Sequence, residues 1–365
     1  MRINFFLLGL RENGGGSHQN AIVFVRALRQ LGHTVNVFTF GQDSESPRDI
    51  KITVLDENSG SFAAKLERRA RIFKENENDC DVFFVYGHSL LWPAGLYRKS
   101  GGSLPVAVYL DSHSDSMKEQ YRYGFLHRIK FRAWELVRGL SFAKHIDCFC
   151  AVSPYLKDRY VKAGFLAEKF SIVPNAFDFK EPSPRSQRSV PRILFVARLS
   201  FEKGPDIFVD ALALLKDKTW TARILGDGPL REPLEERIRM NGLSDRVSLG
   251  GWKQYPELPH EYAAADLLAA SSRTPEPFGR AIVEAMHEGV PVIVPEGSGA
   301  AWVGNGAALT FERGSVESLK RTIQTLLTDS QKRNELASHT KVRARDFDAQ
   351  KIGEKLSLAL ERLLV

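Results

Sequence analysis

The chain has 365 residues, of which 43% are hydrophobic and 26% are charged, and its formal net charge is +7. This composition is that of an ordinary globular protein, and the length fits two domains of roughly 170 residues each. No apolar run approaches the roughly 20 residues that span a bilayer, and the short apolar start lacks a signal-peptide cleavage pattern. The three cysteines lack metal-ligand spacing and favour a reducing compartment, so we expect a cytoplasmic protein.

The first forty residues predict a strand, a glycine loop, a helix and a second strand. Apolar residues 3–8 precede three glycines that include Gly15 and Gly16, and a helical pattern follows, ending before the apolar residues 35–40. This order is typical of a βαβ unit of the nucleotide-binding type. The loop lacks G-x-G-x-x-G and the later acidic residue, which argues against a dinucleotide-dependent oxidoreductase. A tight turn without a ligand is the alternative interpretation of the glycines.

His113 follows one of the next strands of this half. The pattern predicts further strands and helices at residues 63–74, 81–86, 105–110, 146–153, 154–160 and 172–174. In an open parallel sheet the carboxyl ends of the strands are where ligands bind, so His113 is a candidate site residue, although a purely structural role is the alternative. Residues 181–191 contain three prolines and predict a linker.

The second half opens with another strand, at residues 193–197, followed by Arg198 and Lys203 and a helix over 206–215. Two cations beside a helix N-terminus suit a diphosphate, whereas the alternative is a pair of surface residues that cap loops. The next strand, 222–225, ends in a turn with Gly226 and Gly228, whose lack of a side chain permits close approach of a ligand to the backbone.

The most informative stretch is 272–295. A short strand at 265–270 opens into a loop because Pro275 and Pro277 prevent regular pairing, and a helix follows Gly279. Glu276 and Glu284 flank the start of this helix, whose unpaired N–H groups favour an anion. The carboxylates accept hydrogen bonds well from sugar hydroxyls.

Glu276 and Glu284, with seven residues between them and the intervening Pro277-Phe278-Gly279, resemble the E-x7-E signature of retaining GT-B glycosyltransferases of the family-four type. Segments 174–178, 195–212 and 226–229 resemble other motifs of that family, in the same order. The resemblance implies an α/β fold of GT-B type, with two Rossmann-like doubly wound domains and an interdomain cleft. We therefore predict an acceptor-binding domain at 1–180, a linker at 181–191, a nucleotide-sugar domain at 192–345, and a final helix at 346–365 that crosses back.

The same resemblance implies roles for individual residues. Glu276 would hold the hydroxyls of the donor sugar and Glu284 those of the ribose, while Arg198, Lys203 and His113 would lie at the diphosphate. The other expected donor contacts are Gly15, Gly16, Gly226, Gly228, Pro277, Phe278, Gly279 and Arg280. The expected enzyme is a retaining hexosyltransferase that needs no metal or other cofactor. Family members often carry GGxxE after the next strand, whereas this chain has no acid in 297–302.

The expected partners are a nucleotide-sugar donor and a saccharide or glycolipid acceptor, in lipopolysaccharide or exopolysaccharide assembly. Residues 118–144 are rich in basic and aromatic residues, which suits an anionic membrane surface on the inner face of the cytoplasmic membrane. A helix with core-facing aromatics is the alternative. Nucleic acid is not expected, since no binding motif accompanies the charge. A sugar-nucleotide epimerase of the same fold and a non-catalytic sugar-nucleotide-binding protein remain alternative functions.

Overall fold

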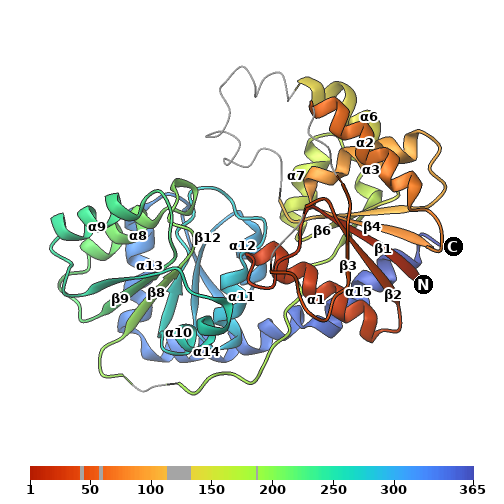
Figure 1. The fold of residues 1–365 in the computed structure, drawn as a ribbon. Helices are drawn as coiled ribbons and strands as arrows, with labels where there is room; N and C mark the ends of the chain where they lie inside the picture. The colour runs from red at the N-terminus through yellow and green to blue at the C-terminus, as the bar shows by residue number, and fades with distance from the viewer. Residues whose placement is uncertain (42–44, 57–60, 113–132, 186–187) are drawn as a thin grey trace. The chain divides into compact units, whose positions relative to one another are not determined.

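The chain forms two compact units, seen in a computed structural model that describes residues 1–41, 45–56, 61–112, 133–185 and 188–365. Unit 1 comprises Met1–Asp178 together with Asp348–Val365, and unit 2 comprises Phe179–Phe347. Each unit holds one parallel sheet with helices on both faces (Figure 1). This is the two-domain α/β Rossmann-like architecture that the sequence predicts. His113 and most of the 118–144 stretch lie outside the described residues.

Unit 1 is built on a seven-stranded sheet of order β3-β2-β1-β4-β5-β6-β7. Its strands are β1 (Arg2–Leu7), β2 (Thr34–Thr39), β3 (Ile52–Val54), β4 (Val82–Tyr86), β5 (Val106–Leu110), β6 (Cys148–Ala151) and β7 (Phe170–Ile172). Its helices are α1 (Gly16–Gln30), α2 (Phe62–Glu75), α3 (Leu91–Lys99), α6 (Leu140–Ala143), α7 (Pro154–Lys162) and α15 (Ala349–Glu361), with a π-helical turn at Glu135–Gly139.

The central strands of unit 1 are buried along their whole length, which explains why they appear in the sequence as continuous apolar runs. Aromatic rings fill much of this core. Phe5 stacks on Phe84 of the neighbouring strand with ring centroids 4.8 Å apart, and Phe24 of α1 meets Tyr109 edge-on at 4.9 Å. Stacked and edge-to-face pairs of this kind stabilise a core beyond their buried area, each by about 0.5–1.5 kcal/mol.

Unit 2 is built on a six-stranded sheet of order β10-β9-β8-β11-β12-β13. Its strands are β8 (Arg192–Val196), β9 (Thr221–Leu225), β10 (Val247–Gly251), β11 (Leu267–Ala269), β12 (Val292–Pro295) and β13 (Ala308–Phe311). Its helices are α8 (Pro205–Ala213), α9 (Arg231–Met240), α10 (Leu258–Ala263), α11 (Arg280–His287), α12 (Gly299–Val303), α13 (Val316–Thr328) and α14 (Ser330–Ala344).

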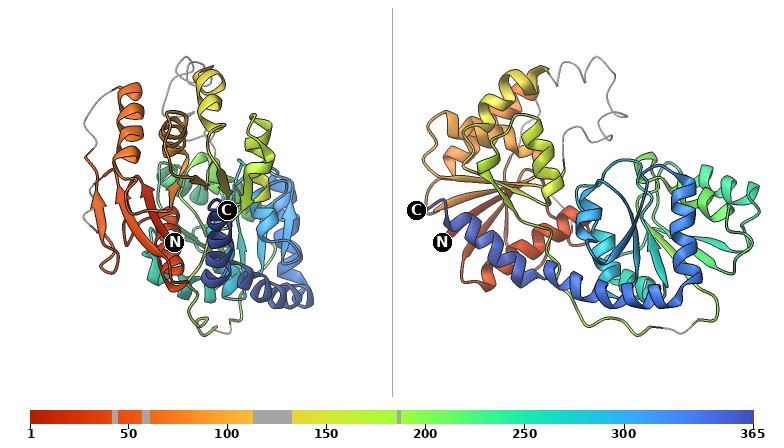
Figure 2. Two further views of the ribbon diagram at one scale, coloured as in Figure 1. Left: turned by 90° about the vertical axis from the view of Figure 1, so that its right-hand side faces the viewer. Right: turned by 180° about the vertical axis from the view of Figure 1, so that it is seen from behind.

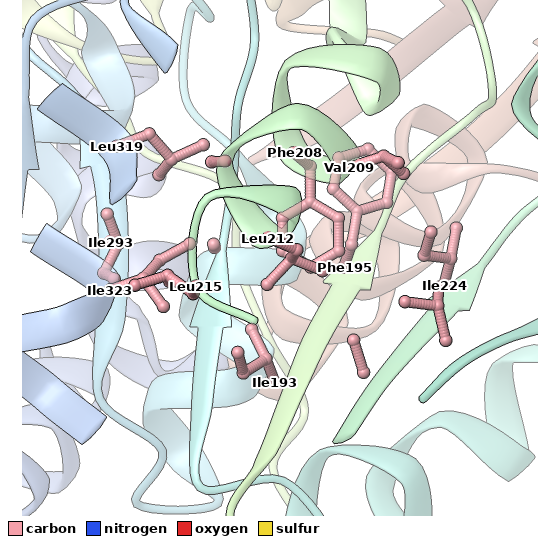
Figure 3. Packing of buried hydrophobic residues seen from close by; sticks show 14 of the residues in the cluster. Ile193, Phe195, Phe208, Val209, Leu212, Leu215, Ile224, Ile293, Leu319 and Ile323 are labelled. Carbon is pink, nitrogen blue, oxygen red and sulfur yellow. The ribbon is translucent and has the colours of Figure 1, made fainter. Parts of the chain in front are cut away.

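Alternate residues of the strands in unit 2 point into one hydrophobic core. Phe195 of β8 and Phe208 of α8 lie with ring centroids 5.4 Å apart, and Ile323 of α13 belongs to the same cluster (Figure 3). α8, α9 and α13 cover this face of the sheet, and α10, α11 and α14 cover the other (Figure 1). The core fixes β8 in the middle of the sheet, where its carboxyl end carries the loop with Arg198 and Lys203.

The C-terminal residues 329–365 form two helices rather than one continuous segment. α14 ends at Ala344, and Asp348 then caps α15 by accepting a hydrogen bond from the Gln350 N–H at 2.9 Å. α15 packs beside α1 of unit 1, as the right-hand view of Figure 2 shows for the dark blue and red helices. Gly353 makes this approach possible, since a Cβ there would lie 2.8 Å from the Cβ of Ala27.

The predicted strand at 172–174 is wrong in position, because β7 covers Phe170–Ile172. Phe170 lies opposite Phe149, and Val173 donates a last ladder bond to Ala151 at 2.9 Å. Pro174 follows and has no N–H, so pairing cannot continue. The three cysteines are buried and form no disulfide.

A half-buried carboxylate, that of Glu77, links three elements of unit 1. Glu77 accepts hydrogen bonds from the Tyr97 hydroxyl at 2.6 Å and the Ser103 N–H at 2.7 Å, and Lys74 Nζ lies 2.7 Å from its second oxygen. Burial opposes ionisation, but the hydrogen bonds from Lys74, Tyr97 and Ser103 outweigh it and lower the pKa of Glu77 to about 2. Glu77 therefore ties the end of α2 to α3 and to the loop before β5.

Replacing Glu77 by Gln should make stability depend less on pH. The pKa falls from 4.5 to about 2 on folding, so this stabilisation is present above pH 4.5 and is lost as the pH falls toward 2. We expect a loss of about 1–2 kcal/mol at pH 7 that shrinks below pH 4.5, measured by urea unfolding. Glu317→Gln, which removes an exposed partner of Lys320, is the control. A loss that does not change with pH would contradict this assignment.

Candidate functional site

Two loops of unit 2 leave the sheet at its topological switch point. The chain passes from β8 to β9 and β10 on one side and then returns to place β11 on the other side of β8. Leu194 of β8 lies opposite Arg223 of β9 and opposite Leu268 of β11. The loops after β8 and β11 therefore diverge from neighbouring carboxyl ends, the place where open α/β sheets bind ligands.

The structure brings Lys203 and Glu276 together across these two loops. Lys203 Nζ lies 2.7 Å from Glu276 Oε1, and their side chains are 31% and 14% exposed. Ser272 donates a second hydrogen bond to the same oxygen. Burial opposes ionisation of Glu276, but the charge of Lys203 and the hydrogen bonds from Lys203 and Ser272 prevail and lower its pKa. The site therefore holds an ionised carboxylate at neutral pH.

α11 begins beside this carboxylate. Gly279 precedes the helix in a left-handed conformation, φ +93°, and as a glycine it has no side chain that could cap the first turn. A Cβ on Gly279 would lie 2.6 Å from Ile282 Cδ1 and 3.3 Å from Glu276 Oε2, so only glycine leaves this carboxylate oxygen open. The N–H groups at the helix start give this end of the helix a partial positive charge.

Glu284 lies one turn into the same helix and is held by two neighbours. Tyr262, a buried residue of α10, donates to Glu284 Oε2 at 2.8 Å, and Arg280 Nε lies 3.7 Å from Oε1. Burial and then the charge of Glu284 raise the pKa of Tyr262 well above its ordinary value, so the phenol stays a donor. The side chains of Arg280 and Glu284 are each 13% exposed.

Arg198 differs from Lys203 in its surroundings. Its side chain is exposed and, among the residues that the structure describes, has no ion-pair partner. Gly226 and Gly228 face the backbone of its loop. A Cβ on Gly226 would lie 1.9 Å from the Ala197 carbonyl oxygen, and one on Gly228 would lie 2.5 Å from that of Leu199. These two glycines therefore let the loops after β8 and β9 pack together.

Phe278 is buried, and its ring packs in an aromatic cluster. Its ring meets Phe347 edge-on at 5.3 Å and lies 6.5 Å from Trp302. Gly299 donates its N–H to the Glu276 carbonyl at 2.8 Å, and a Cβ on it would lie 1.8 Å from the Pro277 carbonyl oxygen. Residues 297–302 are the segment that lacks the acid of the GGxxE pattern. This segment thus supports the Glu276 loop through its backbone.

In unit 1, Gly15 and Gly16 stand exposed at the start of α1, at the carboxyl edge of the sheet. Ser17 in the first turn of this helix donates to Asp111 Oδ2, after β5, at 2.7 Å. A carboxylate therefore already complements the positive end of α1. The glycine loop and Asp111 therefore meet at one polar edge of the sheet.

Sequence reasoning missed the residues that hold the site together. Tyr262 lies 22 positions before its partner Glu284, and Arg273 lies 67 positions after its partner Asp206. No local pattern marks such pairs. The position of Ser272 four residues before Glu276 was the one signal available.

The fold defines the chain as a two-domain α/β protein, with a paired lysine and glutamate at the switch point of its second unit. The model of the family "Glycosyl transferases group 1" matches residues 177–343, and that of "Glycosyltransferase Family 4" matches residues 14–181. The chain therefore belongs to the family-four type of GT-B glycosyltransferases.

Several known proteins resemble the chain. Mannosylfructose-phosphate synthase of Agrobacterium fabrum is 27% identical over 338 residues, which cover 79% of this chain and 72% of that protein. The lipopolysaccharide core biosynthesis glycosyltransferase LpsE of Rhizobium meliloti is 26% identical over 206 residues, 54% of this chain and 59% of that protein.

Solved structures share the fold. Sucrose-phosphate synthase from Thermosynechococcus elongatus matches with a TM-score of 0.82 and 19% identity, covering 99% of this chain and 98% of that one. Anabaena HepE, solved in complex with UDP and glucose, matches with a TM-score of 0.77 and 22% identity, covering 98% and 99%. Within the described part of the chain, no helix is long and apolar enough to cross a membrane.

Gly204, which joins Lys203 to α8, offers a test of how tightly the two loops pack. It has φ +61°, and a Cβ would lie 2.3 Å from the Ser271 carbonyl oxygen. Gly242 has nearly the same φ, +62°, with open space around it. Gly242→Ala should lower the free energy of unfolding by about 1–2 kcal/mol through backbone strain alone. Gly204→Ala should lower it by about 1–3 kcal/mol more, because its Cβ also meets the Ser271 carbonyl oxygen. Chemical unfolding measures both, and equal losses would show that the loops do not pack as described.

Proposed function

We propose that the chain transfers a sugar from a nucleoside diphosphate sugar to a hydroxyl group of a saccharide or glycolipid, with retention of the anomeric configuration. The observation that supports this most strongly is the contact between Lys203 and Glu276 at the switch point of unit 2. A cation that can bind a phosphate and a carboxylate that can bind a hydroxyl group therefore lie side by side. A sugar nucleotide offers those two groups on adjacent atoms.

Arg198 and Lys203 would bind the diphosphate. Negative charge gathers on this leaving group as the glycosidic bond breaks, and fixed cations stabilise that charge without reorganisation. The exposed guanidinium of Arg198 can contact phosphate oxygens bidentately. The backbone N–H groups near Gly279 and Arg280 would add the positive end of α11.

Glu276 would bind the hydroxyls of the donor sugar through Oε2. Both side-chain hydrogen bonds from described residues reach Oε1, so Oε2 keeps its capacity to accept. The absence of a side chain on Gly279 leaves that oxygen accessible. Glu284, oriented by Tyr262, would accept from the ribose hydroxyls.

Other predicted donor residues act through the backbone in this proposal. The buried ring of Phe278 anchors the loop in its aromatic cluster, so its contact with the donor, like that of Pro277, would come from main-chain atoms. Gly226 and Gly228 would contact the donor through backbone atoms of the loop after β9. Gly15 and Gly16 would contact it through backbone atoms of the glycine loop of unit 1.

Retention of the anomeric configuration requires the acceptor hydroxyl to attack the sugar from the same face that the leaving diphosphate vacates. We propose that the departing phosphate itself takes the proton of the acceptor hydroxyl, so that no enzyme carboxylate forms a covalent bond to the sugar. His113 would lie close to these atoms. The cationic side chains would supply the positive charge that a metal provides elsewhere, and we therefore propose metal-independent transfer without a cofactor.

The relatives support a role in saccharide assembly. LpsE is described as a lipopolysaccharide core biosynthesis enzyme, and another relative, from Mycobacterium tuberculosis and 28% identical over 204 residues, as a GDP-mannose-dependent mannosyltransferase. The structure of Anabaena HepE was solved with UDP and glucose. We therefore propose a nucleotide-sugar donor and an acceptor of the lipopolysaccharide or exopolysaccharide class.

An acceptor of that class places the enzyme at the cytoplasmic face of a membrane, and residues 118–144 remain our proposed contact. In the described part of this stretch, Val137 is 75% exposed and Arg138 is also exposed. Trp134 instead packs edge-on against Trp92 at 5.7 Å. Apolar and basic side chains together suit an anionic lipid surface.

Calorimetry with UDP and GDP tests the diphosphate assignment. Lys203→Ala should raise Kd for the nucleotide that binds wild type by at least about tenfold, corresponding to about 1.4 kcal/mol. The Lys203→Ala variant leaves Glu276 as an unpaired buried charge. The double variant Lys203→Met/Glu276→Gln removes both charges and should show the same rise in Kd. Lys320→Ala removes a lysine paired to Glu317 on α13 and should leave Kd unchanged. Wild-type affinity in both Lys203 variants would refute the assignment.

Glu284→Gln should also weaken binding, since an amide accepts less strongly than a carboxylate. The effect should depend on the ribose, because UDP would lose affinity in this variant while inorganic diphosphate would not. Tyr262→Phe removes only the orienting hydroxyl and should have a smaller effect in the same direction. Equal losses for UDP and inorganic diphosphate would place Glu284 at the phosphates instead.

A further inference from the structure

Arg273 links the two loops that carry Lys203 and Glu276. It follows β11, and its guanidinium makes a two-pronged ion pair with Asp206 in the first turn of α8, with Nη1 2.6 Å from Oδ1. The same nitrogen donates to the Phe201 carbonyl at 3.1 Å, and the Arg273 backbone N–H donates to the Glu202 carbonyl at 2.9 Å. One residue therefore binds both ends of the segment that holds Lys203.

The Arg273 guanidinium pairs with the Asp206 carboxylate and stacks on the Phe201 ring. The Arg273 and Asp206 side chains are each only 24% exposed, and the guanidinium carbon lies 4.4 Å from the centroid of the Phe201 ring. A planar fork can pair with a carboxylate and stack on a ring at the same time, and lysine cannot reproduce this. Such an ion pair loses less to solvent screening than an exposed one.

The sequence places these contacts next to the site. Asp206 is three residues after Lys203, and Arg273 is three residues before Glu276. Ser271 adds a hydrogen bond from its hydroxyl to the Gly204 carbonyl at 2.7 Å. The Arg273 and Ser271 contacts therefore join the same two loops that carry the 2.7 Å contact between Lys203 and Glu276.

We propose that Arg273 and Asp206 form a clamp that sets the distance between Lys203 and Glu276, and that both are positioning residues for the diphosphate and sugar contacts. This inference rests on the proposed function. The clamp touches no substrate itself. It keeps the cation and the carboxylate at the spacing that a sugar diphosphate requires, so that binding does not have to order the two loops.

The chain contains a matched control for this proposal. Asp210, one turn further along α8, makes a two-pronged ion pair with Arg237 of α9, with both contacts at 2.6 Å. This pair lies on the same helix but joins two helices rather than the two site loops. Arg237→Lys therefore removes a bidentate guanidinium–carboxylate contact of the same kind, but not one between the two site loops.

Hydrogen–deuterium exchange tests the clamp without any ligand. Arg273→Lys keeps the charge but loses the fork, and it should speed exchange in peptides covering 198–204 and 271–279. Arg237→Lys should leave both peptides at wild-type rates, and thermal unfolding of the two variants should differ little. Unchanged exchange in the Arg273 variant would overturn the clamp. This readout is independent of the proposed function.

Calorimetry with UDP and GDP tests the positioning role. Arg273→Lys should raise Kd for the nucleotide that binds wild type by at least about fivefold, but it should add little in a Lys203→Met background because its effect passes through that residue. Faster exchange with wild-type Kd, or an undiminished effect in the Lys203→Met background, would overturn the positioning role. If wild type binds neither nucleotide, the proposed function fails, and with it the positioning role, while the exchange result still decides whether the clamp exists.

Discussion

The ion pair between Lys203 and Glu276 is the interaction on which this site depends. A carboxylate that is 14% exposed needs a cation to remain ionised, and here the cation comes from a loop 73 residues away in sequence. The sheet order of unit 2 makes the meeting possible, because β8 and β11 are neighbours although two strands separate them in the chain. The site is therefore a product of topology as much as of residue choice.

Close backbone packing keeps the loops in place. Gly226 faces the Ala197 carbonyl oxygen, Gly204 faces that of Ser271, and Gly299 faces that of Pro277, each at a distance that leaves no room for a Cβ. These glycines lie after β9, β8 and β12 and join their loops to the neighbouring ones. The lack of a side chain at these positions is a structural requirement of this edge, and the close packing holds the polar groups in a fixed arrangement before any ligand binds.

The sequence predicted the two-unit α/β fold because parallel strands buried on both faces leave long apolar runs, and glycines or prolines mark their ends. Glu276 and Glu284 could be proposed as site residues because one short segment carries both. The clamp of Arg273 and Asp206 could not, since a pairing across 67 residues depends on the sheet order. The burial of Phe278 was missed for the same reason, because its partners Trp302 and Phe347 come from later elements.

A crystal structure of the chain with a bound nucleoside diphosphate sugar tests the central claim most directly. The diphosphate should lie within hydrogen-bond distance of Lys203 and Arg198, with Glu276 Oε2 on a hydroxyl of the sugar and Glu284 on the ribose. If the ligand occupies another part of the molecule while Lys203 and Glu276 contact only each other, the account of this site is wrong.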